Sequence, residues 1–144
     1  MKIAFYKGLK YGNWLDKLIC LGTMSRYSHC EIVFSDGVSA SSSPRDGGVR
    51  FKNINYSDDK WTLFDVIYPS DVDFEAMVRY HFAVHEGDKY DYLGAFFSAF
   101  GIDASSDDRK FCSQICGLIL GSTNSGVITP GGLKKRMKLK GQIQ

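Results

Sequence analysis

Residues 110–120, with the sequence Lys-Phe-Cys-Ser-Gln-Ile-Cys-Gly-Leu-Ile-Leu, decide how the rest of the chain is interpreted. Their apolar side chains recur at helical spacing, and the polar Ser113 and Gln114 fall on the other side of that helix. A charged, turn-like run at residues 105–110 stops just before it, so Cys112 is expected in the first turn of a buried helix. Free backbone N–H groups and the positive end of the helix dipole favour a thiolate there. Cys112 is therefore either a small core residue or a nucleophile.

Length and composition indicate a single domain that covers residues 1–144. The chain of 144 residues is 44% hydrophobic, which is enough for an ordinary core. Its ten Phe, eight Tyr and two Trp suit a fold that contains a sheet. The formal net charge is only +2, so the chain as a whole gives no strong polyelectrolyte signal.

Basic residues gather near the C-terminus. This basic tail contains Lys134, Lys135, Arg136, Lys138 and Lys140. One interpretation is a solvated helix end followed by a frayed terminus, and the other is contact with nucleic acid or anionic lipid. We favour the first.

The four cysteines, at positions 20, 30, 112 and 116, form no CxxC pair and no zinc-ribbon spacing. Cys112 and Cys116 lie four residues apart on one helix face, which is poor geometry for a disulfide. The N-terminal segment lacks the apolar region of a secretion signal, and no run approaches the ~18 apolar residues of a membrane span. We therefore expect free thiols in a cytoplasmic protein with no transmembrane segment.

A second stretch with residue types suited to catalysis is Tyr-Ser-His-Cys-Glu-Ile-Val-Phe at residues 27–34. Its pattern is typical of a strand. Side chains of a strand alternate, so His29 and Glu31 are expected on one face and Cys30 on the other. A His and a Glu side by side can act as a general base with its orienting carboxylate. Cys30, like Cys20 and Cys116, is expected to be a packing residue of the core.

The remaining pattern predicts an α+β fold with an antiparallel sheet of about five or six strands. The helix that begins near Cys112 is expected to pack against the sheet, and the other helices to lie on its flanks. Strands are predicted at residues 2–6, 27–34, 38–41, 49–51 and 61–68. Helices are predicted after Asn13, after Asp71 or Asp73, and in a last short segment that starts near Pro130.

Several motifs, taken in order, resemble those of the circularly permuted NlpC-type, YiiX-like, papain-fold cysteine peptidases and amidases. The order is histidine first and cysteine last, and the similarity spans most of the chain. Gln114 stands where that family commonly has Glu. The similar segments are the histidine strand at 27–34 with Asp36-Gly37, the hairpin return at 47–50, the loop at 87–92, the cysteine helix at 111–116 and the ending at 128–133.

The resemblance implies a fold of the permuted papain type, with Cys112 as nucleophile and His29 as general base. In that family a third, usually acidic residue comes from the strand after the histidine strand, and Ser39 occupies that place here. Glu31 shares the face of His29 and can substitute, so we favour Glu31 and keep Ser39 as the alternative. The resemblance also suggests a tyrosine near the site, either Tyr6 or Tyr90.

His81 and His85 are spaced i, i+4 on a predicted helix, which can hold a metal, but no third ligand is evident. We therefore expect neither a metal nor a cofactor.

The expected function is that of a cysteine hydrolase that cleaves a small peptide, amide or other acyl substrate through a covalent acyl-enzyme. The resemblance makes peptidoglycan-type peptides a natural substrate and a phage-encoded member a natural source, so the expected location is the cytoplasm of a bacterial or phage-infected cell. Two alternatives stay open. One is a lipid or thioester acyl hydrolase or acyltransferase, and the other is an inactive binding or inhibitor module on the same fold.

Overall fold

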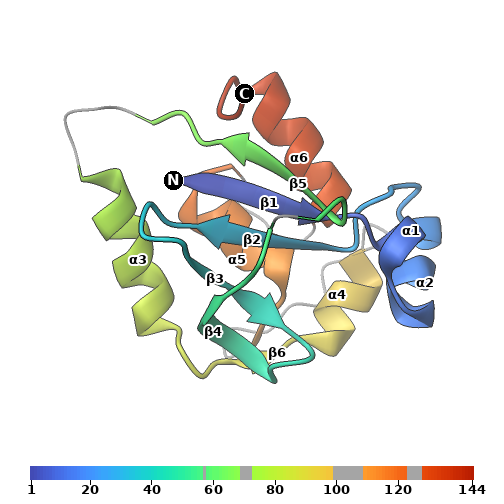
Figure 1. Ribbon diagram of the computed structural model, residues 1–144. Helices are drawn as coiled ribbons and strands as arrows, with labels where there is room; N and C mark the ends of the chain where they lie inside the picture. The colour runs from blue at the N-terminus through green and yellow to red at the C-terminus, as the bar shows by residue number, and fades with distance from the viewer. Residues whose placement is uncertain (57, 69–72, 99–108, 123–127) are drawn as a thin grey trace.

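The computed structural model describes residues 1–56, 58–68, 73–98, 109–122 and 128–144. Over this part of the chain the protein is an α+β fold in which helices surround one sheet (Figure 1). The strands are β1 (Lys2–Tyr6), β2 (His29–Val33), β3 (Val38–Ser43), β4 (Gly48–Asn53), β5 (Trp61–Asp65), β6 (Lys89–Tyr90) and β7 (Arg109–Lys110). The helices are α1 (Gly8–Tyr11), α2 (Trp14–Gly22), α3 (Phe74–Val84), α4 (Tyr92–Ser98), α5 (Cys112–Ile119) and α6 (Pro130–Leu139).

The strands form one seven-stranded sheet in the order β5-β1-β2-β3-β4-β6-β7. Every neighbouring pair is antiparallel except β6 and β7, which are parallel. The prediction of about five or six strands was therefore too low for the described residues. The two additional strands have two residues each, which is too short for an alternating pattern to be recognised. The turn expected at Arg109 and Lys110 was also wrong, because these two residues form β7.

The hydrophobic core lies between the sheet and α5, which Figure 1 shows behind the strands. Alternation along β1 and β2 sends Ile3, Phe5, Cys30 and Ile32 into this core, where each is fully buried. The antiparallel register pairs Phe5 with Cys30, so the two central strands present one continuous apolar face. Helix α5 contacts β2 and β3 on that face.

Helix α5 buries polar side chains as well as apolar ones, while its apolar Leu118 is 40% exposed. We expected Ser113 and Gln114 to face away from the core, and this was wrong, because both are buried. The Ser113 hydroxyl donates to the carbonyl oxygen of Ile128 at 2.6 Å. The Gln114 side-chain oxygen accepts the backbone N–H of Phe111 at 3.3 Å. These bonds satisfy the polar groups, so burial carries no unpaired-group penalty.

Helix α6 and the C-terminal residues are held firmly against the sheet. Pro130 occupies the first turn of α6, and Leu133 and Met137 are fully buried. The expected frayed terminus was wrong, because the backbone N–H of Ile67 donates to the carbonyl oxygen of Gln142 at 2.8 Å. Ile143 is buried beside Val66. Among the described residues, no helix is long and apolar enough to cross a membrane.

A core substitution in α3 tests this packing. Phe82 is fully buried and its ring lies 6.4 Å from that of Phe51. Phe82→Ala leaves a cavity, so we expect it to lower the free energy of unfolding by about 3–5 kcal/mol in urea denaturation. Val84→Ala on the same helix is the matched control, because Val84 is 59% exposed and should change stability by less than about 0.5 kcal/mol. Equal effects of the two variants would contradict the packing.

Candidate active site

Cys112 is the first residue of α5 and is 3% exposed. Phe111, the residue before it, has an extended backbone, so the chain turns sharply into the helix at the cysteine. The first N–H groups of a helix have no partner within the helix and carry the positive end of its dipole. The sequence therefore placed Cys112 correctly in the first turn of a buried helix.

His29 is the first residue of β2 and contacts Cys112 at the end of that strand. The imidazole and the thiol are close enough to interact, and each shifts the pKa of the other. The Nε2 atom of His29 lies 2.7 Å from Oε1 of Glu31. Since Nε2 is occupied by the carboxylate, Nδ1 is the ring nitrogen left for the sulfur. The imidazole thus lies between a thiol and a carboxylate.

The electrostatics favour the charged forms of both Cys112 and His29. A hydrogen bond from the Cys30 thiol lowers the pKa of Cys112, and the charge and hydrogen bond of His29 lower it further, although burial opposes them. Burial by itself lowers the pKa of His29, but Cys112 and Glu31 outweigh this effect and raise the pKa to about 10. Both shifts favour the thiolate form of Cys112 and the imidazolium form of His29.

Glu31 is anchored by Arg50, a residue that the sequence did not identify. Two guanidinium nitrogens of Arg50 donate to the two carboxylate oxygens of Glu31 at 2.7 and 2.6 Å. Burial favours the protonated form of Glu31, but the hydrogen bonds from Arg50 and His29 lower its pKa below the ordinary value. The Nε atom of Arg50 donates to Asp46 at 2.9 Å, and Lys52 bonds to the same carboxylate. Glu31 is consequently an ionised carboxylate in a fixed position.

The register of the sheet explains why Arg50 reaches Glu31. Ile32 pairs with Ala40, and Ser41 pairs with Arg50, so Arg50 lies across β3 from Glu31 with the small Ser41 between them. The signal available in the sequence was indirect. A carboxylate expected on a buried strand needs a cation nearby, and the predicted hairpin return contains one in Arg50.

Ser39, the alternative third residue, and the candidate tyrosines Tyr6 and Tyr90 differ in what surrounds their hydroxyl groups. Ser39 is fully buried, and its hydroxyl bonds to that of Tyr56 at 2.8 Å, whereas Glu31 is the residue that contacts His29. The Tyr6 hydroxyl donates to the carbonyl oxygen of Tyr11 at 2.9 Å, which occupies it away from Cys112. Tyr90 is buried, and burial raises its pKa well above the ordinary value, so it keeps its proton beside Cys112.

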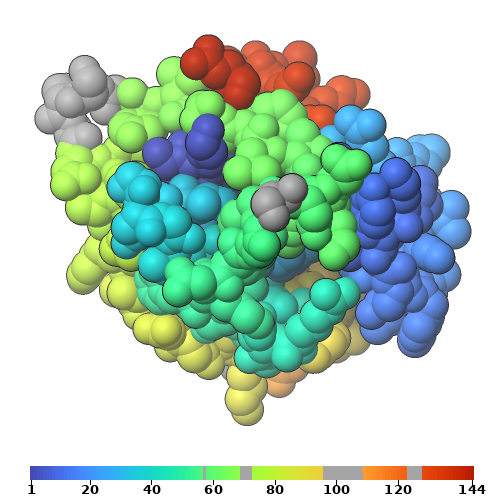
Figure 2. Space-filling view, viewed as in Figure 1, coloured from blue at the N-terminus to red at the C-terminus, as the bar shows by residue number. Residues whose placement is uncertain are grey.

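A cavity of about 320 Å³ opens beside His29 and Glu31. In Figure 2 it lies between the blue helices α1 and α2 and the teal hairpin of β3 and β4. Its wall includes Tyr6, Trp61 and Tyr90. Cys112 lines a much smaller hollow, of about 10 Å³, that shares Ser28, Tyr90 and Ile19 with the larger cavity. A bound molecule can therefore fill the larger cavity while its reacting group points toward the sulfur.

The other cysteines are buried free thiols. Alternation was expected to place Cys30 in the core, and it is fully buried there, but its thiol and its backbone N–H also bond to the Cys112 sulfur. Burial raises the pKa of Cys30 well above the ordinary value and that of Cys20 to about 11. Of Cys20, Cys30 and Cys112, Cys112 is the one with a lowered pKa.

Within the described ranges, no group of three or more His, Cys, Asp or Glu side chains could hold a metal ion. His85 bonds through Nδ1 to the Asp88 carboxylate at 2.8 Å. His85, at the end of α3, therefore has a carboxylate as its partner.

Neither a protein-family model nor a curated protein matches this chain. The functional interpretation consequently depends on the geometry of Cys112, His29, Glu31 and Arg50.

The role of Glu31 can be separated from that of Ser39 by titrating His29. In a Cys112→Ala background, Glu31→Gln removes the carboxylate charge and should lower the His29 pKa by about 1–3 units in an NMR titration of the imidazole signals. Ser39→Ala should leave that pKa unchanged, since Ser39 bonds to Tyr56 instead. A His29 pKa that responds to Ser39→Ala and not to Glu31→Gln would reverse the assignment.

The Arg50–Glu31 pair also predicts a stability effect. Arg50→Met leaves the Glu31 carboxylate buried without its main partner, so we expect the free energy of unfolding to fall by about 3–5 kcal/mol. Arg45→Met is the matched control, because Arg45 is largely exposed and makes one ion pair, with Asp16 at 3.1 Å. Arg45→Met should lower the free energy of unfolding by at most about 1 kcal/mol. Similar losses for the two variants would mean that Arg50 does not support the site.

Proposed function

We propose that the protein is a cysteine hydrolase that cleaves an amide, peptide or ester bond through an acyl-enzyme on Cys112. The observation that carries this proposal is the continuous chain of contacts from Cys112 to His29, Glu31 and Arg50. A buried cysteine of the core needs neither a lowered pKa nor a hydrogen-bonded imidazole. A nucleophile needs both, together with a group that orients the imidazole.

The proposed reaction begins with attack of the Cys112 thiolate on the substrate carbonyl carbon. The backbone N–H groups at the start of α5 stabilise the oxyanion, and the His29 imidazolium gives its proton to the leaving amine or alcohol. This breaks the scissile bond and leaves a thioester on Cys112. Neutral His29 then takes a proton from water, the hydroxide attacks the thioester, and the acid leaves as the thiolate and imidazolium reform.

We further propose that the fold is of the permuted papain type, as the sequence resemblance implied. Support comes from the chain order, in which the histidine strand precedes the cysteine helix, and from the packing of that helix against a mostly antiparallel sheet. An inactive binding module would be favoured by the lack of a third residue beside His29. Glu31 fills that position at 2.7 Å, which favours a catalytic role. Small peptides of the peptidoglycan type are the first substrates to screen.

The test is the pH dependence of Cys112 alkylation by iodoacetamide. A lowered Cys112 pKa means that the thiolate is present below the pH at which an ordinary thiol ionises, so alkylation should be fast at neutral pH and should change little toward pH 9. In His29→Ala the imidazolium is absent, and the rate should rise about tenfold per pH unit toward the ordinary thiol pKa of about 8.5. Mass spectrometry of peptides assigns the modified residue.

Cys20 serves as the internal control, because its pKa of about 11 should keep it unreactive at neutral pH. In hydrolysis assays Cys112→Ala and His29→Ala should each lower kcat by at least about 10³-fold. The proposal fails if the parent and His29→Ala proteins are alkylated with the same pH profile.

A further inference from the structure

Helix α2 is oriented with its apolar side toward solvent. We define the α2 patch as Trp14, Leu15, Leu18, Leu21 and Met24, which are between 50% and 97% exposed. At 100° per residue the four helical members fall within one third of the helix circumference. The inner side of α2 contains Asp16, Ile19 and Cys20, a mixture of polar and apolar residues. A contiguous exposed apolar stripe of this kind marks an interaction surface.

The polar interactions of α2 fix this orientation. Asn13 caps the helix, with its side-chain oxygen accepting the backbone N–H of Asp16 at 3.0 Å. The Asp16 carboxylate accepts hydrogen bonds from Ser28 at 2.7 Å and from Arg45 at 3.1 Å. Because these partners belong to the body of the protein, Asp16 must point inward and the leucines outward. The exposure of the patch is therefore imposed by the fold.

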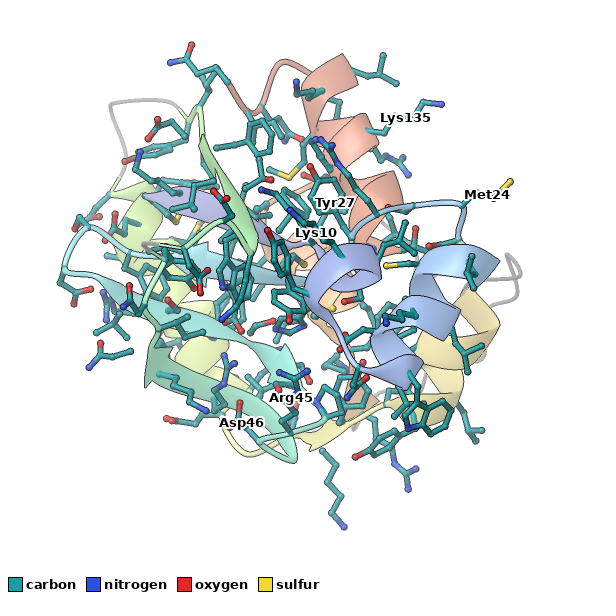
Figure 3. All side chains as sticks on the ribbon, turned by 45° about the vertical axis from the view of Figure 1, so that its right-hand side comes forward. Lys10, Met24, Tyr27, Arg45, Asp46 and Lys135 are labelled. Atoms are coloured by element: carbon teal, nitrogen blue, oxygen red, sulfur yellow. The ribbon has the colours of Figure 1, made fainter. Side chains whose placement is uncertain are left out.

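Met24 extends the patch beyond the end of α2. It is 97% exposed and has a backbone φ of 47°, a left-handed conformation that is unusual for a side chain of this size. Figure 3 shows Met24 pointing away from the body of the molecule. A flexible apolar side chain held in this position by the turn is suited to insertion into another apolar phase.

The chain segment that carries the α2 patch has more basic than acidic residues. Residues 7–26 contain Lys7, Lys10, Lys17 and Arg26, against the single acid Asp16, which is paired inward. The basic helix α6 continues this rim, since Gly131 lies directly against Ser25 and Lys134 bonds to the Tyr27 hydroxyl at 2.9 Å. Lys135 projects on the same side of the molecule as Met24 (Figure 3).

We propose that the α2 patch and its basic rim form a docking surface for an anionic lipid membrane. An apolar stripe with Trp and Leu, bordered by Lys and Arg, is the pattern of helices that lie in the membrane interface. A second copy of the chain fits less well, because a two-fold contact would bring the basic rims of both copies together. The anionic lipid headgroups supply negative charges that pair with the basic residues of the rim.

Docking in this way would place the hollow at Cys112 close to the lipid surface. Ile19, on the inner side of α2, and Thr23, just after its last residue, line that hollow. Resting on the proposed function, this favours substrates whose acyl group is presented at a membrane. The binding itself does not require catalysis, so it can be measured in Cys112→Ala protein, where failure to bind is distinguishable from failure to hydrolyse.

The experiment is flotation of Cys112→Ala protein with vesicles of phosphatidylcholine alone or with 30% phosphatidylglycerol. We expect at least tenfold tighter binding to the anionic vesicles and a marked weakening in 0.5 M NaCl. A blue shift of the fluorescence should accompany binding and disappear in Trp14→Phe, since Trp14 would enter the apolar layer.

The decisive comparison uses two variants that change exposed apolar residues to Glu. Leu18→Glu should weaken binding at least tenfold, whereas Val84→Glu on α3 should leave it unchanged, because the two positions are 55% and 59% exposed but only Leu18 lies in the patch. Circular dichroism checks that both variants are folded. The proposal is overturned if the chain does not bind anionic vesicles, if both variants bind equally well, or if Leu18→Glu only breaks a dimer that shows no affinity for lipid.

Discussion

The buried ion pair of Glu31 and Arg50 is the constraint on which the candidate site depends. Glu31 is a residue of β2 that is only 1% exposed, and burying its carboxylate is costly unless a partner offsets the lost hydration. The two-point contact with Arg50 does this and also ties β2 to β4 across β3. Since Glu31 is held from one side, its other contact can fix the ring of His29 and direct it toward Cys112.

The sequence was sufficient where a pattern is local and long enough to repeat. Strands β1 and β2 and the start of α5 follow from alternation and from helical spacing, and their predicted positions agree with the structure to within a few residues. Strands β6 and β7 could not be predicted, because two residues contain no period. Arg50 was missed for a different reason, since its contact with Glu31 depends on the register of a hairpin that no local pattern specifies.

Burial of polar residues was the other source of error. A helical projection sorts Ser113 and Gln114 by polarity and places them on the side of the helix away from the core. It does not include the carbonyl oxygen of Ile128, which accepts the hydrogen bond of the Ser113 hydroxyl. The same limit applies to α2. Its stripe of leucines predicts a helix correctly, whereas the orientation of that stripe is decided by Ser28 and Arg45, the distant partners of Asp16.

The placement of the chain ends has a consequence for folding. Strand β1 lies inside the sheet between β5 and β2, and residues near the C-terminus pair with the segment that follows β5. His29 and Cys112 are brought together by contacts of high sequence separation, which form late because loop closure must come first. A growing chain therefore contains an ordinary, weakly reactive thiol at Cys112. The activated sulfur arises only when β2 and α5 have packed together, so its reactivity reports that this packing is complete.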